Sequence, residues 1–252
     1  MINGLYTATS GMAMQQKRLD VISQNLANLN TIGHKKEVPV FAEYIANASE
    51  TPDDVIRNSD YNQMINSTVR LYDIKTSFEQ GYLKETANDM DMALTNPNAF
   101  FAVDTPFGIR FTRNGEFTVN DQNELTTMEG YKVVSNMDSM QPVQMVEGAT
   151  ITEDGTMLVN GAPVNNIEIV QFPDTANLQK TGHNLYVAVD ALPEAAENPG
   201  LYTGYLEGSN VNPVDEMVKM IEASRGFETY SKIIQTFDEL NSKAATEVGK
   251  VS

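Results

Sequence analysis

The stretch SNVNPVDEMVKMIEASRGFETYSKIIQTFDELNSKAATEV, residues 209–248, decides how the rest of the chain is interpreted. Asn212 is a favourable N-cap, and Pro213 suits the first helical position, where its missing N–H is not needed. Asp215 follows three residues after the cap, where its carboxylate can accept hydrogen bonds from free backbone N–H groups. Gly249 is a suitable C-terminal stop. We therefore predict one helix of about 35 residues, roughly 50 Å long.

Mostly apolar residues recur along this helix at alternating steps of three and four. A 3.5-residue period held over about four heptads is typical of a coiled coil. The residues of this C-terminal seam are Met220, Ala223, Phe227, Tyr230, Ile234, Phe237, Asn241, Ala244 and Val248. A helix this long exceeds one face of a small core, so we expect it to pair with another helix.

The N-terminal residues 1–36 supply a second helix with the same alternation, which we expect to end between Leu29 and Gly33. Its seam residues are Leu5, Ala8, Met12, Gln15, Leu19, Ile22, Leu26 and Leu29. One such stripe usually packs on its own domain. Two stripes, one in each terminal stretch, favour helical arms that pair with each other and with arms of other copies, so both seams form the predicted assembly interface. Gln15 and Asn241 interrupt the seams, and we expect them to face each other and fix the register of antiparallel arms.

Composition restricts the classes of function. The chain has 252 residues, 41% hydrophobic and 20% charged, and no cysteine, so disulfides and thiolate metal sites are excluded. No apolar run is long enough to span a bilayer, and because the first residues lack the basic-then-apolar pattern of a secretory signal peptide, we expect none. The net charge is −17, and residues 37–208 alone carry −18. This acidic middle argues against nucleic-acid binding, which requires lysine and arginine against phosphate.

The middle of the chain changes character. Residues 37–68 are weakly patterned and read as a connecting extension. From residue 69 to 208 the period becomes two, with β-branched and aromatic residues alternating with polar ones, which predicts a β-rich domain. Asn114-Gly115 and Asn160-Gly161 predict tight turns. The aromatic residues expected in the core are Phe100, Phe101, Phe107, Phe111 and Phe117.

Catalytic patterns are sparse. Asp89 and Asp91 could bind Mg²⁺ or act as acid and base, but no glycine-rich phosphate loop accompanies them, so we interpret them as turn residues. His34 and His183 are far apart and lack neighbouring ligands, which argues against zinc. We expect no enzyme, no cofactor and no metal.

Four stretches resemble a known family. LYTATSGMAMQQKRLDVISQNLANLNTIGHKK (5–36) and LEGSNVNPVDEMVKMIEASRGFETYSKIIQTFDE (206–239) resemble the terminal signatures of bacterial flagellar rod and hook proteins. GYLKETANDMDMAL (81–94) and FFAVDTPFGIRFTRNGEF (100–117) are similar to the central motifs of hook-basal-body proteins of the FlgF/FlgG type. The terminal motifs are long and specific.

The resemblance implies a structural subunit of the flagellar basal-body rod, the drive shaft that joins motor to hook. It implies export through the flagellar type III apparatus without a cleaved signal peptide, helical assembly through terminal helices, and a place in the basal body. The expected partners are copies of the chain, neighbouring rod and hook proteins, and the export apparatus, with no nucleic acid and no membrane insertion.

The fold class predicted from these patterns is α+β, with long N- and C-terminal helices pairing as a coiled coil around an inserted β-rich domain. The expected organisation is a helical arm (1–36), an extension (37–68), the β-rich domain (69–208) and a second arm (209–252). Two alternative functions remain. One is a discrete assembly or export chaperone, which would not polymerise, and the other is a carbohydrate-active enzyme using Asp89 and Asp91 in a groove.

Overall fold

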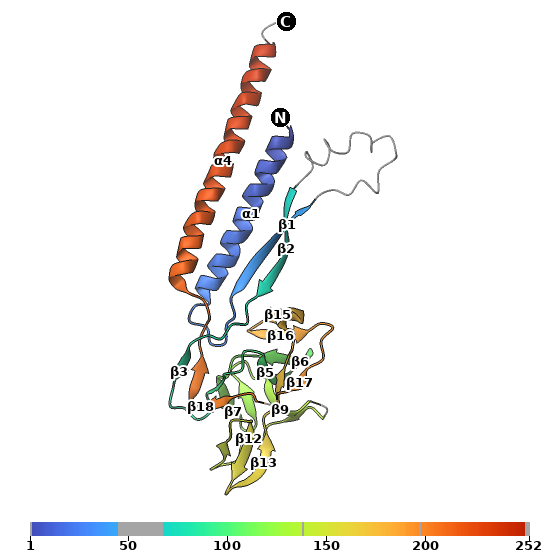
Figure 1. The fold of residues 1–252 in the computed structure, drawn as a ribbon, viewed down its shortest axis with the longest axis vertical. Coiled ribbons are helices and arrows are strands. Elements are labelled where there is room, and N and C mark those ends of the chain that lie inside the picture. The colour runs from blue at the N-terminus through green and yellow to red at the C-terminus, as the bar shows by residue number, and fades with distance from the viewer. Residues whose placement is uncertain (1, 45–67, 138, 197, 250–252) are drawn as a thin grey trace, which may run out of the picture. The chain divides into compact units, whose positions relative to one another are not determined.

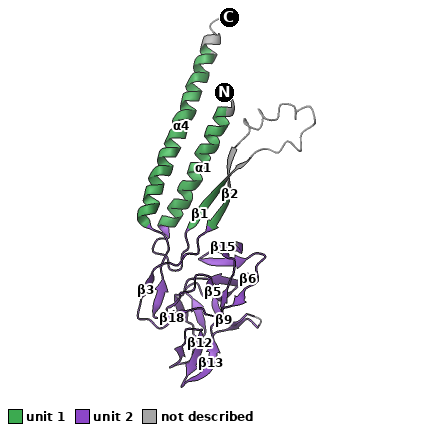
Figure 2. Ribbon diagram, viewed as in Figure 1, with its two compact units in different colours: residues 1–26, 37–75, 213–252 green, residues 27–36, 76–212 purple. Residues whose placement is uncertain are grey.

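The computed structural model describes residues 2–44, 68–137, 139–196 and 198–249. The chain forms two compact units (Figure 2). Unit 1 comprises residues 1–26, 37–75 and 213–252, and unit 2 comprises residues 27–36 and 76–212. Each unit is thus assembled from segments that are distant in the sequence.

Unit 1 holds the helices. Helix α1 spans Ile2–Ala27 and helix α4 spans Pro213–Gly249, and the two run side by side (Figure 1). Helix α4 begins directly after Asn212 and ends at Gly249, so both predicted ends are confirmed. Strands β1 (Glu37–Tyr44) and β2 (Thr68–Thr76) pair as a two-stranded ribbon. The rest of the predicted extension, residues 45–67, lies outside the described residues.

The predicted fold class is wrong in its coiled coil. Among the described residues the chain has two α-helices against nineteen strands, so α+β fits only loosely. The two helices meet at glycines, where backbone and side chain approach closely, instead of through a continuous heptad seam. The seam positions Asn241 and Ala244 are exposed on α4. The pattern misled the prediction because it placed the contact on the seam residues of both helices, whereas each of these close contacts pairs a glycine of one helix with a seam side chain of the other.

Unit 2 is built from short antiparallel strands. A ten-stranded sheet follows the order β15-β16-β6-β5-β9-β8-β7, with β10 on β9, β14 on β5 and β17 on β14. Three smaller sheets pair β11-β12-β13, β18-β4 and β19-β3. The bounds are β3 Leu83–Glu85, β4 Met92–Leu94, β5 Ala99–Thr105, β6 Gly108–Thr112, β7 Phe117–Val119, β8 Leu125–Thr127, β9 Lys132–Asn136, β10 Gln141–Pro142, β11 Thr150–Ile151, β12 Thr156–Val159, β13 Ala162–Asn166, β14 Ile169–Gln171, β15 Leu178–Gly182, β16 Leu185–Ala188, β17 Glu194–Ala195, β18 Leu201–Thr203 and β19 Tyr205–Glu207.

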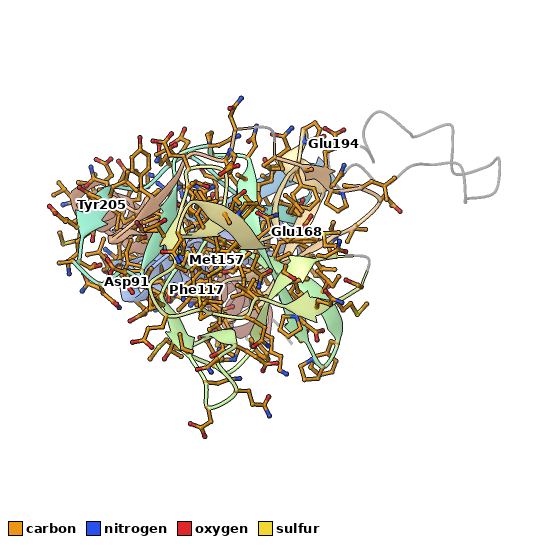
Figure 3. The ribbon with its side chains drawn as sticks, turned by 90° about the horizontal axis from the view of Figure 1, so that it is seen from below. Asp91, Phe117, Met157, Glu168, Glu194 and Tyr205 are labelled. Atoms are coloured by element: carbon orange, nitrogen blue, oxygen red, sulfur yellow. The ribbon has the colours of Figure 1, made fainter. Side chains whose placement is uncertain are left out.

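Strand β5 is the centre of unit 2 because it is buried on both faces. Ala99, Phe101 and Val103 belong to one apolar cluster, whereas Phe100 and Ala102 belong to a second. This alternation follows from the two-residue period of a strand. The first cluster includes Phe117 and Met157, which are labelled near the middle of Figure 3.

Four of the five phenylalanines expected in the core are buried there, and one is not. Phe100, Phe101, Phe111 and Phe117 are at most 5% exposed. Phe107 is 83% exposed, because it lies between β5 and β6 in the turn and not in a strand.

The two Asn-Gly pairs behave differently. Asn160 (φ 52°) and Gly161 (φ 79°) adopt the left-handed conformation between β12 and β13, as a tight hairpin turn requires. Neither Asn114 nor Gly115 has a positive φ. A Cβ at Gly115 would lie within bonding distance of the Met92 carbonyl oxygen, so this glycine serves close packing.

Candidate functional site

The contact between α1 and α4 fixes an antiparallel register within unit 1. A Cβ built on Gly11 would lie 2.5 Å from the Tyr230 ring, and one on Gly226 would lie 2.9 Å from the Gln15 side chain. A Cβ on Gly4 would lie 3.1 Å from the Phe237 ring. From one contact to the next, the residue number rises along α1 by as much as it falls along α4, as in an antiparallel pair. The glycines let the two helices approach closely at these points.

The base of the helix pair is held by a buried amide. Asn25, 1% exposed, donates from Nδ2 to the Glu37 carbonyl oxygen (2.8 Å) and accepts from the Glu37 N–H at Oδ1 (2.9 Å). The same Nδ2 lies 3.4 Å from the carboxylate of Glu216. Glu216 is itself 1% exposed and pairs with Lys219 at 3.0 Å. One side chain thus connects the end of α1, the start of β1 and the first turn of α4.

The predicted seam residues occupy several environments. On α1, Ala8 and Ile22 are buried and Leu5, Met12, Gln15, Leu19 and Leu26 are half-buried, while the half-buried Leu29 lies beyond the helix in unit 2. On α4, Ala223 is buried and Met220, Phe227, Tyr230, Ile234 and Phe237 are half-buried. Asn241 and Ala244 are exposed, and the side chain of Val248 is not among those described. Several of these residues therefore face the other helix of the same chain.

The predicted pairing of Gln15 with Asn241 is wrong. Gln15 lies against Gly226, and Asn241 is exposed. In the antiparallel register Gly4 lies against Phe237, so Asn241 lies beyond the described start of α1. The prediction placed Gln15 and Asn241 near the same end of the paired helices, whereas the contact of Gln15 with Gly226 separates them along α4.

A second apolar surface on α4 was missed by the sequence reasoning. Val214, Met217, Val218 and Ile221 are 47% to 62% exposed. At about 100° of rotation per residue they lie on the side of α4 opposite Glu216 and Ala223. We call these four residues the outer patch. Their spacing of i, i+3, i+4 and i+7 is the ordinary signal of an apolar helix face, but the heptad interpretation concealed it.

Further along α4 an open groove follows the helix. It has a volume of about 390 Å³ and is lined by Thr229, Lys232, Ile233, Thr236, Phe237 and Leu240. Ile233 is 39% and Leu240 is 50% exposed. We call this the distal groove. Exposed apolar side chains in two places on one helix are candidate interaction surfaces.

Unit 2 contains a buried cluster of three charged residues. Glu207 accepts from Lys35 Nζ (2.8 Å), from Arg113 Nε (2.8 Å) and Nη2 (2.7 Å), and from the Gly81 N–H (2.9 Å). Lys35 Nζ also donates to the Glu79 carbonyl oxygen (2.7 Å). All three charged side chains are at most 1% exposed. The cluster holds together segments that are far apart in the chain.

Burial lowers the pKa values of the two basic side chains in this cluster. Desolvation lowers the pKa of Lys35 to about 8, although the Glu207 carboxylate opposes the shift and Arg113 adds to it. Desolvation likewise lowers the pKa of Arg113, again against the attraction of Glu207. Sequence reasoning did not find the cluster because isolated Lys, Arg and Glu residues are normally exposed.

The aspartates considered for chemistry serve a turn. Asp91 is 6% exposed, its carboxylate accepts from Asn88 Nδ2 (3.1 Å), and its carbonyl oxygen accepts from the Gly204 N–H (2.8 Å). Asp89 is exposed. In the described part of the chain, no group of three or more His, Cys, Asp or Glu residues could hold a metal ion. Nor is any helix within that part long and apolar enough to cross a membrane.

Comparison with known proteins gives consistent matches along the chain. The family models matched are "Flagella basal body rod protein" (residues 5–35), "Flagellar hook protein FlgE/F/G D1 domain" (95–159) and "Flagellar basal body rod FlgEFG protein C-terminal" (202–247). The outer patch and the distal groove both fall within the last of these ranges.

Individual relatives match over nearly their full lengths. The chain is 35% identical to the flagellar hook-basal body complex protein FlhO of Bacillus subtilis, over 100% of both chains. It is 30% identical to the flagellar basal-body rod protein FlgF of Caulobacter vibrioides, again over 100% of both. Identity to the flagellar basal-body rod protein FlgG of Borreliella burgdorferi is 34%, over 95% of this chain and 96% of that protein.

Proposed function

The chain belongs to the flagellar basal-body rod protein family, and from this premise we propose that it is a rod subunit that polymerises through exposed apolar faces of its helical unit. Its structural role in the rod and its location in the flagellar basal body follow from the family. The proposal adds self-assembly, contacts with neighbouring rod and hook proteins, and export through the flagellar type III apparatus without a cleaved signal.

The observation that carries the proposal is the exposure of the outer patch. Val214, Met217, Val218 and Ile221 would each release structured water on burial, at roughly 25 cal/mol per Å² of apolar surface. A single copy leaves all four uncovered, although α1 already covers the opposite side of α4. A subunit that forms contacts only after assembly is expected to have such a surface.

The predicted seam remains part of the proposal in a modified role. Residues such as Tyr230 and Phe237 stabilise the helix pair of one chain through Gly11 and Gly4. The pair then presents the outer patch and the distal groove to other copies. No observation favours the chaperone alternative, and Asp91, one of the two aspartates considered for glycoside hydrolysis, is 6% exposed and accepts a hydrogen bond from Asn88.

The test places two charges in the outer patch. A strain lacking the gene is complemented with Val218→Asp/Ile221→Asp, and the isolated hook-basal bodies are probed for the protein. We expect loss of incorporation and of swimming, while the purified variant keeps the β-sheet signal of unit 2. Gln235→Asp, a single charge on an exposed position of α4, is the matched control and should be incorporated. Normal incorporation of the double variant would refute assembly through this face, and a purified wild-type protein that stays a discrete dimer would favour a chaperone.

A further inference from the structure

We propose that Asn160 is a site of spontaneous deamidation, at which the side-chain amide is converted with water into aspartate and isoaspartate. The residue lies in the turn that joins β12 to β13 in unit 2 (Figure 1). Unit 2 holds two Asn-Gly pairs, Asn114-Gly115 and Asn160-Gly161, which have the same local chemistry but different surroundings. The inference concerns a covalent modification and is independent of the proposed function.

The reaction needs the asparagine side chain, the next backbone N–H and water. The amide nitrogen of Gly161 attacks Cγ of Asn160, so that a new N–C bond forms and the side-chain nitrogen leaves as ammonia with the proton of the attacking amide. Water then opens the five-membered imide ring at one of its two carbonyl carbons. Opening at Cγ gives aspartate, whereas opening at the main-chain carbonyl leaves the chain running through Cγ and gives isoaspartate. Glycine at the second position favours the attack because it has no Cβ to obstruct the ring.

The surroundings of Asn160 leave this reaction unobstructed. Asn160 and Gly161 are both exposed. The Asn160 side chain forms no hydrogen bond with the residues that the structure describes. A Cβ built on Gly161 would meet nothing within 4 Å. The side chain is therefore free to rotate toward the Gly161 nitrogen, and water reaches both carbonyl carbons of the ring.

The surroundings of Asn114 oppose the same reaction. Its Oδ1 accepts a hydrogen bond from the Glu116 N–H (3.0 Å), which fixes the side-chain amide. Gly115 is buried, and its carbonyl oxygen accepts from the Met92 N–H (2.9 Å). The Met92 carbonyl oxygen lies so close that a Cβ on Gly115 would overlap it. Ring closure has to turn the peptide between Asn114 and Gly115 against these contacts, so unit 2 must open locally before this pair reacts.

Conversion at Asn160 changes the hairpin but not the core of unit 2. Isoaspartate adds one carbon atom to the main chain of a turn that is closed by the pairing of Val159 with Ala162. Both products add a negative charge beside β13, a mostly exposed strand at the edge of a three-stranded sheet. Met157 is the residue of β12 that belongs to the apolar cluster, and it precedes the reacting pair. We therefore expect the modified protein to stay folded and to differ in its charge and in this turn.

The two Asn-Gly pairs of unit 2 can be compared in one sample. Purified full-length protein is incubated in mildly alkaline buffer, and peptide mapping by mass spectrometry follows both pairs. We expect Asn160 to convert at least about tenfold faster than Asn114, a difference of about 1.4 kcal/mol in activation free energy. Methyl transfer from S-adenosylmethionine by a protein-isoaspartate methyltransferase should label the Asn160 peptide. A parallel sample in concentrated urea is the matched control, because loss of structure should bring the two rates together. Equal rates in the folded protein, or conversion of Asn160 only in urea, would overturn the proposal.

Asn160→Gly gives an independent result. Glycine readily adopts the left-handed conformation of this position (φ 52°) and carries no side-chain amide, so the hairpin is retained while the reaction is lost. On isoelectric focusing, the more acidic form that accumulates first in wild type should be absent from the variant. An acidic form that accumulates in the variant at the wild-type rate would place the reactive amide elsewhere and refute the assignment.

Discussion

At the scale of single residues, the buried cluster of Lys35, Arg113 and Glu207 is the feature with the largest energetic consequence. Two cations and one anion are taken from water, and the anion is satisfied by four donors. A buried ion pair is not in itself a large net gain, but removing one partner leaves an uncompensated charge. The stability of unit 2 therefore depends on Glu207, although this residue lies close to the C-terminal end of the unit.

Glu207→Gln removes the anion and leaves both cations buried. We expect a loss of about 3–5 kcal/mol in the free energy of unfolding of unit 2, the usual cost of breaking a buried ion pair. Denaturant unfolding followed by tyrosine fluorescence measures it. Asp121→Asn, at an exposed position of the same unit, is the control and should stay within about 0.5 kcal/mol of wild type. Equal stabilities for the two variants would show that the cluster is not needed.

The pKa of Lys35 predicts a specific pH dependence. Because the folded-state pKa is lowered to about 8 from the ordinary 10.5, the unfolded chain binds the proton more tightly between these values. The free energy of unfolding therefore rises with pH from about 8 to about 10.5 and gains up to roughly 3 kcal/mol, at 1.36 kcal/mol per pKa unit. Below pH 8 the lysine is charged in both states and contributes no slope. Lys35→Met should lack this rise, so the difference between wild type and variant across the window is the measurement, and a flat difference would contradict the assignment.

None of this cluster could be predicted from the sequence. Its members stand up to 172 positions apart, and no local pattern distinguishes them from solvent-exposed charges. The tight turn predicted at Asn114-Gly115 was wrong for a similar reason. Glycine is needed there because the Met92 carbonyl of a distant strand lies against it. Asn160-Gly161 was predictable because both residues of its turn act locally.

At the scale of elements, local signals predicted both ends of α4, but they placed the end of α1, which lies at Ala27, at least two residues too late and did not show which faces the helices bury. The cap at Asn212, the proline and Gly249 define α4 because they act on the adjacent backbone. The face that contacts α1 depends on the register of two distant segments, and small residues decide it. The heptad pattern ranks residues by hydrophobicity and therefore overlooks Gly4, Gly11 and Gly226, which are the positions of closest approach.

Gly11→Ala tests the close approach of the helices. Alanine favours a helix interior by about 1 kcal/mol over glycine, but its Cβ would lie 2.5 Å from the Tyr230 ring. Since overpacking costs about 1–3 kcal/mol, we expect net destabilisation of unit 1 in thermal unfolding followed by helical circular dichroism. Gly226→Ala is the matched control, because its new Cβ meets the flexible Gln15 amide, which can move aside. Tyr230→Ala should relieve the damage of Gly11→Ala, and the absence of such relief would place the clash elsewhere.

At the scale of the whole molecule, the family resemblance anticipated the structural role, while the exposed apolar surfaces that we propose to serve it were found only in the structure. The terminal motifs quoted from the sequence overlap the matched family ranges 5–35 and 202–247. Motif similarity carries no information about which apolar residues one copy leaves exposed. The outer patch became visible once α1 was placed on the opposite side of α4.

The net charge of −17 opposes any assembly of identical copies, and this sets the expected response to salt. Repulsion between whole subunits acts over long distances and is screened with a Debye length of about 10 Å at 0.1 M salt. We therefore expect the critical concentration for polymerisation to fall as sodium chloride is raised from about 0.01 M to 0.15 M. Sucrose at equal osmolarity is the control for solvent effects. A critical concentration that rises with salt would contradict this expectation, because it would mean that attraction between opposite charges at the contact, and not repulsion between acidic subunits, limits growth.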